Sequence, residues 1–307
     1  MKDFIMKRTL TYHISEPQIN ILSFLKEKGY SNHLITQLKK TDTGIRKNGK
    51  HCYVTKPLQP GDLLEICWSE EETSEGILPV KLPFPVIYED EDILLVNKPA
   101  GMPIHPSINH YEDSLANAAM YYFAEKQEPF TFRCINRLDR DTSGLTILAK
   151  NMLSAGVLGR NTGIKSIQRI YLAIVTGKPP LQGTVDAPIA REAESVITRC
   201  IDPVHGAPAI THYTQLYYDE VHDLSLVRLK LETGRTHQIR LHMKHIGYPL
   251  IGDFLYHPDF LYIKRQALHA AALSFAHPIT GKKMHFSAPL PEDMKNCFSY
   301  LPEDIYL

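Results

Sequence analysis

The chain has 307 residues, of which 43% are hydrophobic and 22% are charged. This balance is typical of soluble globular proteins and excludes a disordered chain, a collagen and a coiled coil. At roughly 150 residues per domain, the length predicts two domains. The 34 basic residues equal the 34 acidic residues in number, so the overall charge does not indicate a polyanionic partner.

The sequence predicts neither a membrane segment nor a secretion signal. The longest aliphatic run, Ile93–Val96, is far shorter than the roughly 20 apolar residues of a membrane helix. The N-terminal segment has no continuous apolar core, so we expect a cytoplasmic protein without a membrane partner. The five cysteines lie at least 15 positions apart, a spacing that fits neither a zinc site nor a CxxC redox pair.

Charge is unevenly distributed near the N-terminus. Between Lys26 and Lys56, eight basic residues stand against two acidic ones, a local balance of +6, whereas residues 61–76 contain six acidic residues and no basic one. This asymmetry is a cue for a surface that faces nucleic acid, although a solvated helix face is the slightly better explanation of the charges alone. Prolines concentrated in residues 79–85 predict a stiff linker, so we place a domain boundary near residue 80.

The first block predicts a small α+β unit. Apolar and polar residues alternate from Leu10 to Ile14, as in a strand, and two short stretches with helical spacing follow at 21–25 and 34–38. Gly44–Lys50 nearly matches a phosphate-binding loop, but His51 stands where Ser or Thr is required. A turn between two strands, with basic side chains outward, explains this segment better.

The second block mixes strands and helices. Short apolar or alternating runs predict strands at 93–96, 145–149, 170–175 and 227–231. Thr236–Ile246 predicts a helix with its cap at Thr236 and with Gly247 just beyond its end.

Three polar stretches of the second block could carry chemistry. Asn136–Gly144 concentrates charges and hydroxyls at a strand entrance, although its last four residues are also good turn chemistry and Asp139 could form a surface ion pair. The stretch from Gly234 opens the predicted helix, where an arginine can clamp a phosphate or pair with a carboxylate. It lacks an HExxH motif, so no metal site is predicted. A single tyrosine on a predicted strand, such as Tyr171, usually packs in the core or at the sheet edge. It would be functional only if its side of the strand faced Asp139.

Taken in order, these stretches resemble the RluA-type pseudouridine synthase family. The resembling segments are 97–106, 136–144, 170–173, 234–242, 266–270 and 277–281, and the resemblance covers about residues 84–295. Residues 18–68 loosely resemble the alpha-L, or ribosomal-protein-S-four-like, RNA-binding module. The resemblance implies a mixed α/β (α+β) pseudouridine synthase fold, with a largely antiparallel central sheet flanked by helices. A small α+β RNA-binding domain (1–80) would precede the catalytic domain (81–307).

The resemblance also implies a function and a site. The chain would be a monomeric isomerase that converts uridine to pseudouridine in structured ribosomal or transfer RNA, without a cofactor or a metal. Asp139 would be the catalytic residue, with Tyr171 stacked on the uracil as a candidate acceptor of the C5 proton and Arg240 paired with Asp139. The implied residues that bind the RNA substrate are Arg137, Asn136, Arg140, Thr142, Lys98, His105, Arg235, Thr236, His237 and Leu268. The implied N-terminal RNA-binding patch comprises Lys39, Lys40, Arg46, Lys47 and Lys50.

Two alternatives stay open at this point. The family usually has histidine at the position of Asn136, and this departure mildly favours a catalytically silent RNA-binding or ribosome-assembly factor. The intact Asp139, Tyr171 and Arg240 argue against it. A glycoside or nucleoside hydrolase would need two carboxylates across the scissile bond, and Asp141 is a poor partner for Asp139 because it belongs to the turn.

Overall fold

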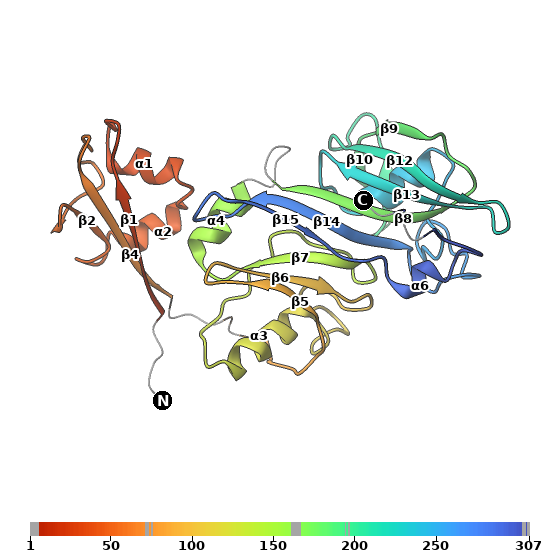
Figure 1. Ribbon diagram of the computed structural model, residues 1–307, viewed down its shortest axis with the longest axis horizontal. Helices are drawn as coiled ribbons and strands as arrows, with labels where there is room; N and C mark the ends of the chain where they lie inside the picture. The colour runs from red at the N-terminus through yellow and green to blue at the C-terminus, as the bar shows by residue number, and fades with distance from the viewer. Residues whose placement is uncertain are drawn as a thin grey trace.

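The computed structural model describes residues 6–70, 74, 76–160, 167–193, 195, 197–302 and 305. It contains two main sheets, one formed by the first 70 residues and one by the rest of the chain (Figure 1). Of the six acidic residues between 61 and 76, Glu71, Glu72 and Glu75 lie outside the described residues.

The first sheet has four antiparallel strands in the order β1 (Met6–His13), β4 (Leu63–Glu70), β2 (Ile45–Lys47) and β3 (Lys50–His51). Helices α1 (Ile21–Glu27) and α2 (Asn32–Leu38) pack on it. Each helix begins at a side chain that accepts a hydrogen bond from the backbone, Asn20 from Ser23 N–H and Ser31 from Leu34 N–H. The predicted strand, the two helical stretches and the turn between two strands are therefore confirmed.

The second sheet has nine strands. Their order is β5 (Val86–Glu89), β6 (Ile93–Lys98), β7 (Ser143–Ala149), β14 (Leu268–Ala276), β8 (Gln168–Thr176), β13 (Leu224–Leu231), β12 (Ile210–Asp219) and β9 (Gln182–Asp186), while β15 (Lys283–Ser287) also pairs with β14. A separate two-stranded sheet joins β10 (Ile189–Arg191) and β11 (Arg199–Ile201). Within the described strands, β7 and β14 run parallel and the other pairs are antiparallel. The expected mixed α/β fold with a largely antiparallel sheet is confirmed.

Helices cover both faces of the large sheet. Helix α3 (Leu115–Glu125) packs on one face of β6 and β7, and Leu158 of α4 (Met152–Arg160) packs on the other. Helix α5 (Gln238–His245) lies against β8 and β13, and α6 (Glu292–Lys295) packs on their opposite face. Consequently Tyr171 and Leu172, neighbours on β8, belong to different hydrophobic clusters, as the alternation of a strand requires.

The first sheet packs beside α4, to the left of the large sheet in Figure 1. Leu153 of α4 completes the hydrophobic cluster of the first sheet. Arg160, at the end of α4, donates to the carbonyl oxygens of Lys26 and Tyr30. Gly29 also lies against α4, because a Cβ atom there would come within 2.5 Å of Val157 Cγ2. The two sheets are thus joined by apolar contacts and by hydrogen bonds.

The predicted start of α5 is wrong by two residues. The helix begins at Gln238, and its N-cap is His237 in the left-handed conformation (φ 57°), without a side-chain cap hydrogen bond. Thr236 is exposed and does not cap the helix. The predicted end is confirmed, because Gly247 follows the last turn with a positive φ of 88°. Within the described ranges, no helix is long and apolar enough to span a membrane.

Candidate active site

Sheet topology brings the predicted catalytic residues together. The loop that carries Asp139 enters β7, and Leu268 begins β14, so the parallel pairing of these interior strands places both at the same end of the strands. Tyr171 lies opposite Ala270 of β14 on the neighbouring strand β8. Gly144 allows this arrangement, because a Cβ atom there would lie 2.4 Å from Ala270 O. One pocket results, lined among others by Arg137, Asp139, Thr142, Tyr171, Arg235, His237, Arg240 and Leu268.

Asp139 is held through one carboxylate oxygen. Arg240 Nη1 donates to Asp139 Oδ2 at 2.9 Å, and His237 Nε2 lies 3.7 Å from the same oxygen. The side chain of Asp139 is 30% exposed, whereas that of Arg240 is 2% exposed. The arginine therefore fixes the carboxylate from the protein interior, and no described residue binds Oδ1, so this oxygen is the one free to react.

A second carboxylate fixes Arg240. Asp253 accepts two hydrogen bonds of 2.7 Å, from Nε and Nη2 of Arg240, and its own side chain is 1% exposed. Burial by itself lowers the pKa of Arg240, but Asp253 and then Asp139 raise it above its ordinary value. Two-point binding sets the plane of the guanidinium, so Asp253 determines where Nη1 meets Asp139.

His237 is the next neighbour of Asp139. The hydroxyl of Tyr256 accepts a hydrogen bond from Arg199 N–H and lies 2.9 Å from His237 Nδ1, to which it can donate its own proton. That arrangement leaves the ring proton on Nε2, which faces Asp139. Burial lowers the pKa of His237 below its ordinary value, whereas Asp139 opposes this shift. The imidazole is therefore neutral at pH 7, and its left-handed backbone is of the kind often found at functional sites.

Tyr171 forms the apolar wall of the pocket. It is 6% exposed and packs in the same cluster as Leu138, Ile239 and Leu268. Burial raises the pKa of Tyr171 above 10, while Arg169 lowers it and Asp139 raises it further. The side chain is therefore a neutral phenol at pH 7, which suits it to contact a planar base.

Asn136 anchors the Asp139 loop without entering the pocket. Its Nδ2 donates to Leu145 O and its Oδ1 accepts from Ile147 N–H, both at 2.9 Å. The buried side chain therefore pairs with β7 as a neighbouring strand would. This contact gives asparagine a structural role at this position, and the departure from the family's histidine no longer favours a silent protein.

Several other predicted substrate-binding residues lie outside the pocket lining. Arg140 is bound to Asp141, His105 packs edge-on against Phe132, and Thr236 is exposed on the turn before α5. Burial and the charge of Arg137 lower the pKa of His105, so its ring is neutral at pH 7.

Lys98 also lies outside the pocket, contrary to the expectation that it contacts RNA. Its side chain is fully buried, and Nζ donates to the carbonyl oxygens of Pro99, Met102 and Arg140 at 2.8 to 2.9 Å. Burial lowers the pKa of Lys98 to about 7 and Asp141 opposes this shift. Three acceptors match the three protons of an ammonium group, so Lys98 ties the turn after β6 to the Asp139 loop.

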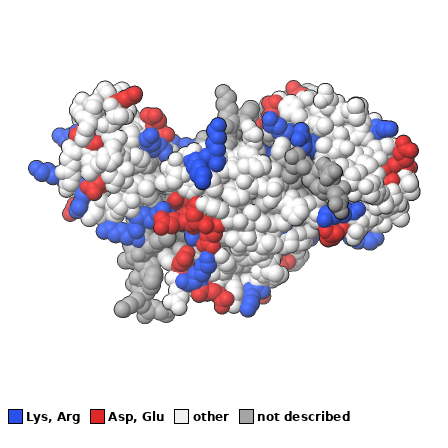
Figure 2. Space-filling model, viewed as in Figure 1, with Lys and Arg blue, Asp and Glu red and all other residues white. Residues whose placement is uncertain are grey.

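The predicted N-terminal patch divides into free and paired side chains. Lys47 pairs with Asp62 at 2.6 Å, a contact that is the main reason why the pKa of Asp62 falls to about 2. Arg46 lies opposite Glu65 in the pairing of β2 and β4. The exposed patch residues without a hydrogen bond or ion pair among the described residues are Lys39, Lys40 and Lys50. In the view of Figure 2, basic and acidic side chains lie intermixed without one continuous basic surface.

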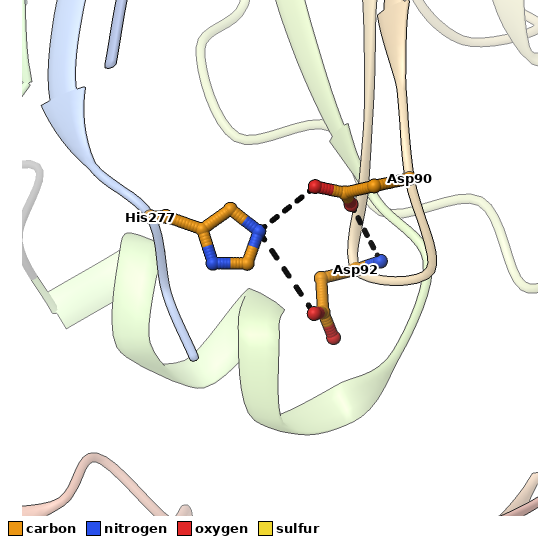
Figure 3. A group of neighbouring side chains, drawn as sticks. All are labelled: Asp90, Asp92 and His277. Atoms are coloured by element: carbon orange, nitrogen blue, oxygen red, sulfur yellow. Dashed lines mark hydrogen bonds and ion pairs between the residues drawn. The ribbon is translucent and has the colours of Figure 1, made fainter. Parts of the chain in front are cut away.

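A separate cluster of Asp90, Asp92 and His277 brings three possible metal ligands together (Figure 3). His277 Nδ1 accepts hydrogen bonds from Ile279 N–H and Thr280 N–H, so the ring proton is on Nε2, which donates to Asp90 Oδ2 at 2.9 Å. A metal would have to displace this proton. The cluster is therefore better described as a hydrogen-bonded junction than as a metal site.

Arg8 gives this junction a structural purpose. Its Nη1 donates to Asp92 Oδ1 at 2.7 Å and to Glu91 O at 2.8 Å. Asn151, just before α4, donates to the same oxygen of Asp92. The junction thus connects β1 of the first sheet with the β5–β6 turn and with α4.

Sequence reasoning missed Asp253, Gln238 and Tyr256. Asp253 follows the apolar run Pro249–Gly252, and an acidic residue after such a run is the signal that could have identified it. Gln238 lies inside the segment 234–242. Its Oε1 accepts hydrogen bonds from Arg235 N–H and the Thr233 hydroxyl, and its Nε2 donates to Ile210 O, so that it shapes the turn before α5. The role of Tyr256 depends on its approach to His237 and had no local sequence signal.

Known proteins resemble this chain over most of its length. The family model described as RNA pseudouridylate synthase matches residues 92–245. The chain is 39% identical over 277 residues to the Bacillus subtilis protein named uncharacterized RNA pseudouridine synthase YjbO, covering 90% of this chain and 97% of that one. It is 41% identical over 237 residues to ribosomal large subunit pseudouridine synthase D of Zymomonas mobilis, covering 73% and 74% respectively.

The solved structures agree with this similarity. Human RNA pseudouridylate synthase domain containing 1 superimposes with a TM-score of 0.58 at 27% identity, covering 70% of this chain and 87% of that structure.

Proposed function

Because this chain belongs to the RNA pseudouridylate synthase family and isomerises uridine to pseudouridine in RNA, we propose that Asp139 is its catalytic residue and that ribosomal RNA is its substrate. The observation that carries the assignment is the approach of Arg240 to Asp139 Oδ2 in the wall of the pocket, with no described residue bound to Oδ1. The names of the relatives from Zymomonas mobilis and Haemophilus influenzae support RNA of the large ribosomal subunit. Transfer RNA is the second substrate class to test.

The reaction needs one reactive carboxylate and a pocket for a uracil that has left its stack. The N1–C1′ bond breaks, the base turns and C5 bonds to C1′, after which C5 loses its proton and N1 gains one. Asp139 acts on the extruded nucleotide as nucleophile or base. Tyr171 stacks on the uracil, and its hydroxyl is the candidate group to take the C5 proton as it passes its own proton to water. Unstacking costs a few kcal/mol, so loops and bulges are the easier targets.

Arg137, Thr142, Arg235, His237 and Leu268 surround the nucleotide in this proposal, because they line the same pocket. Arg137 is the candidate to occupy the space in the RNA stack that the extruded uridine leaves. The RNA backbone beyond the pocket is bound by the first domain, residues 1–80, through the exposed Lys39, Lys40 and Lys50 and mainly through phosphate contacts. We also propose that the protein works as a monomer in the cytoplasm.

Release of tritium from C5 tests the proposal. Unmodified large-subunit ribosomal RNA and transfer RNA, each transcribed with uridine tritiated at C5, are incubated with the wild type and with Asp139→Asn. Forming the C5–C1′ bond expels the label to water, so we expect release from ribosomal RNA by the wild type alone. Release by Asp139→Asn would refute its catalytic role, and release from transfer RNA alone would refute the proposed substrate. Free uracil as the product would indicate a hydrolase.

A further inference from the structure

A second pocket adjoins the active-site pocket, and Leu231 lines both. Its other lining residues are Ile167, Gln168, Arg169, His212, Lys230 and Glu232. The cavity measures about 180 Å³, several times the roughly 30 Å³ that a water molecule occupies in the liquid, so a hydrated ionic group fits. The pocket lies at the ends of β8 and β13, where Arg169 and Leu231 are placed.

Arg169 points to the same side of the sheet as Tyr171, because the two residues are two positions apart on β8. Its guanidinium lies over Gly234, the glycine before Arg235. A Cβ atom at residue 234 would come within 2.8 Å of Arg169 Nη1. Glycine therefore leaves the space that the guanidinium fills, between the active-site turn and the second pocket.

The positive charge of Arg169 is uncompensated. Among the described residues the side chain of Arg169 has no hydrogen bond or ion pair, and its buried Nε has no acceptor. Glu232, which lines the same pocket, forms no ion pair with Arg169, and its Oε1 is bound to His212 Nε2 at 2.6 Å. Lys230 is exposed and also lacks a partner in the described part of the chain. A buried donor without an acceptor costs free energy, and an anion in this pocket would remove that cost.

We propose that this pocket binds a phosphodiester group of the RNA strand next to the target uridine, with Arg169 as the contact. The planar fork of arginine matches the oxygens of a phosphate. An RNA strand carries such a group at every nucleotide, so a strand whose uridine occupies the first pocket presents a neighbouring phosphate beyond Leu231. The inference rests on the proposed function and adds a backbone contact to it.

The test compares Arg169→Gln with wild type on large-subunit ribosomal RNA transcribed with C5-tritiated uridine. Loss of one charge-assisted contact predicts about a tenfold rise in KM and in the Kd of the RNA, with kcat at saturating RNA unchanged. The slope of log Kd against log salt concentration should decrease by about 0.7, the share of one single-strand phosphate. Arg228→Gln is the matched control, because Arg228 is an exposed cation on β13 outside both pockets.

Two further variants guard against a folding defect. Arg169→Lys keeps the charge and should restore most of the salt slope. Gly234→Ala keeps every charge but displaces the guanidinium, so it should raise KM without lowering the thermal unfolding midpoint. A wild-type KM and salt slope in Arg169→Gln would overturn the inference, and so would a fall in kcat alone, which would place the effect on Tyr171. Failure of the wild type to release tritium would instead refute the proposed function.

Discussion

Asp253 binds the guanidinium of Arg240 through two hydrogen bonds of 2.7 Å, and this pair lies almost entirely out of contact with solvent. The arginine is thereby oriented before RNA arrives, and its remaining nitrogen meets Asp139. Asp253 itself is held by the backbone N–H groups of Leu255 and Tyr256. The position of Asp139, the proposed catalytic carboxylate, is therefore determined by a turn more than 110 residues further along the chain.

Arg240→Lys should separate charge from geometry. Lysine keeps the positive charge but cannot bridge two carboxylates with a planar fork. We expect kcat to fall by about a hundredfold or more, the loss of one positioned electrostatic contact at a reacting group, while the Kd of the RNA changes less than twofold. Single-turnover tritium release and equilibrium RNA binding measure the two quantities, with Lys244→Ala on the same helix as the control. Turnover at the wild-type rate would show that the fork is not needed.

Lys98→Met should act on stability rather than on RNA affinity. Methionine fills similar space but leaves three carbonyl oxygens without their donor, which costs about 2–4 kcal/mol of unfolding free energy. Urea unfolding measures this loss, and RNA binding under folded conditions should match the wild type. A large loss of RNA affinity in a variant of normal stability would restore the original expectation that Lys98 contacts RNA.

Tyr171→Phe should separate stacking from proton transfer. Phenylalanine keeps the ring in its hydrophobic cluster, so the Kd of the RNA should stay within twofold of wild type. Tritium release should slow by about a hundredfold, at the lower end of what one side chain contributes by positioned proton transfer. Tyr171→Leu, which loses the ring as well, should also weaken binding. If Tyr171→Phe releases tritium normally, the C5 proton leaves by another route.

Burial of His269 should make the protein sensitive to acid. The side chain is fully buried, and desolvation lowers its pKa to about 4, whereas an unfolded histidine titrates near 6.5. Between these values the unfolded state binds more protons, so the contribution of His269 to stability is complete above pH 6.5 and is lost as the pH falls toward 4. The loss is on the order of 2–3 kcal/mol. Urea unfolding at pH 7.5 and 4.5 should show a smaller difference for His269→Asn than for wild type, and an equal difference would contradict this explanation.

The free lysines of the first domain should control the salt dependence of RNA binding. Replacing Lys39, Lys40 and Lys50 by Gln removes three exposed cations without touching a hydrophobic cluster. The slope of log Kd against log salt should fall by about 2, at roughly 0.7 per phosphate contact. Lys47→Gln is the control, because Lys47 is already paired with Asp62 and should change the slope little. An unchanged slope in the triple variant would show that these residues are only a solvated face.

The sequence by itself determined the strands and helices whose signal is local. Alternation placed β1 and β13, and helical spacing placed α1 and α2, because burial of one face imposes a period on the chain, whereas a continuous apolar run placed β8. Asp139, Tyr171 and Arg240 were also named in advance, through ordered motifs that a resemblance could recognise. The predicted start of α5 was wrong because threonine is a residue type that commonly caps helices. In the structure, Gln238 holds the preceding turn by accepting from Arg235 N–H, and His237 occupies the N-cap position.

Only the tertiary structure decided which charged side chains face the pocket. Lys98 and Asn136 are polar residues that the resemblance assigned to RNA binding. In the structure, both side chains are buried and form hydrogen bonds to the backbone. Asp253 and Arg169 had no motif that marked them as functional. Their roles follow from the pairing of strands and turns distant in sequence, and a local pattern does not encode that pairing.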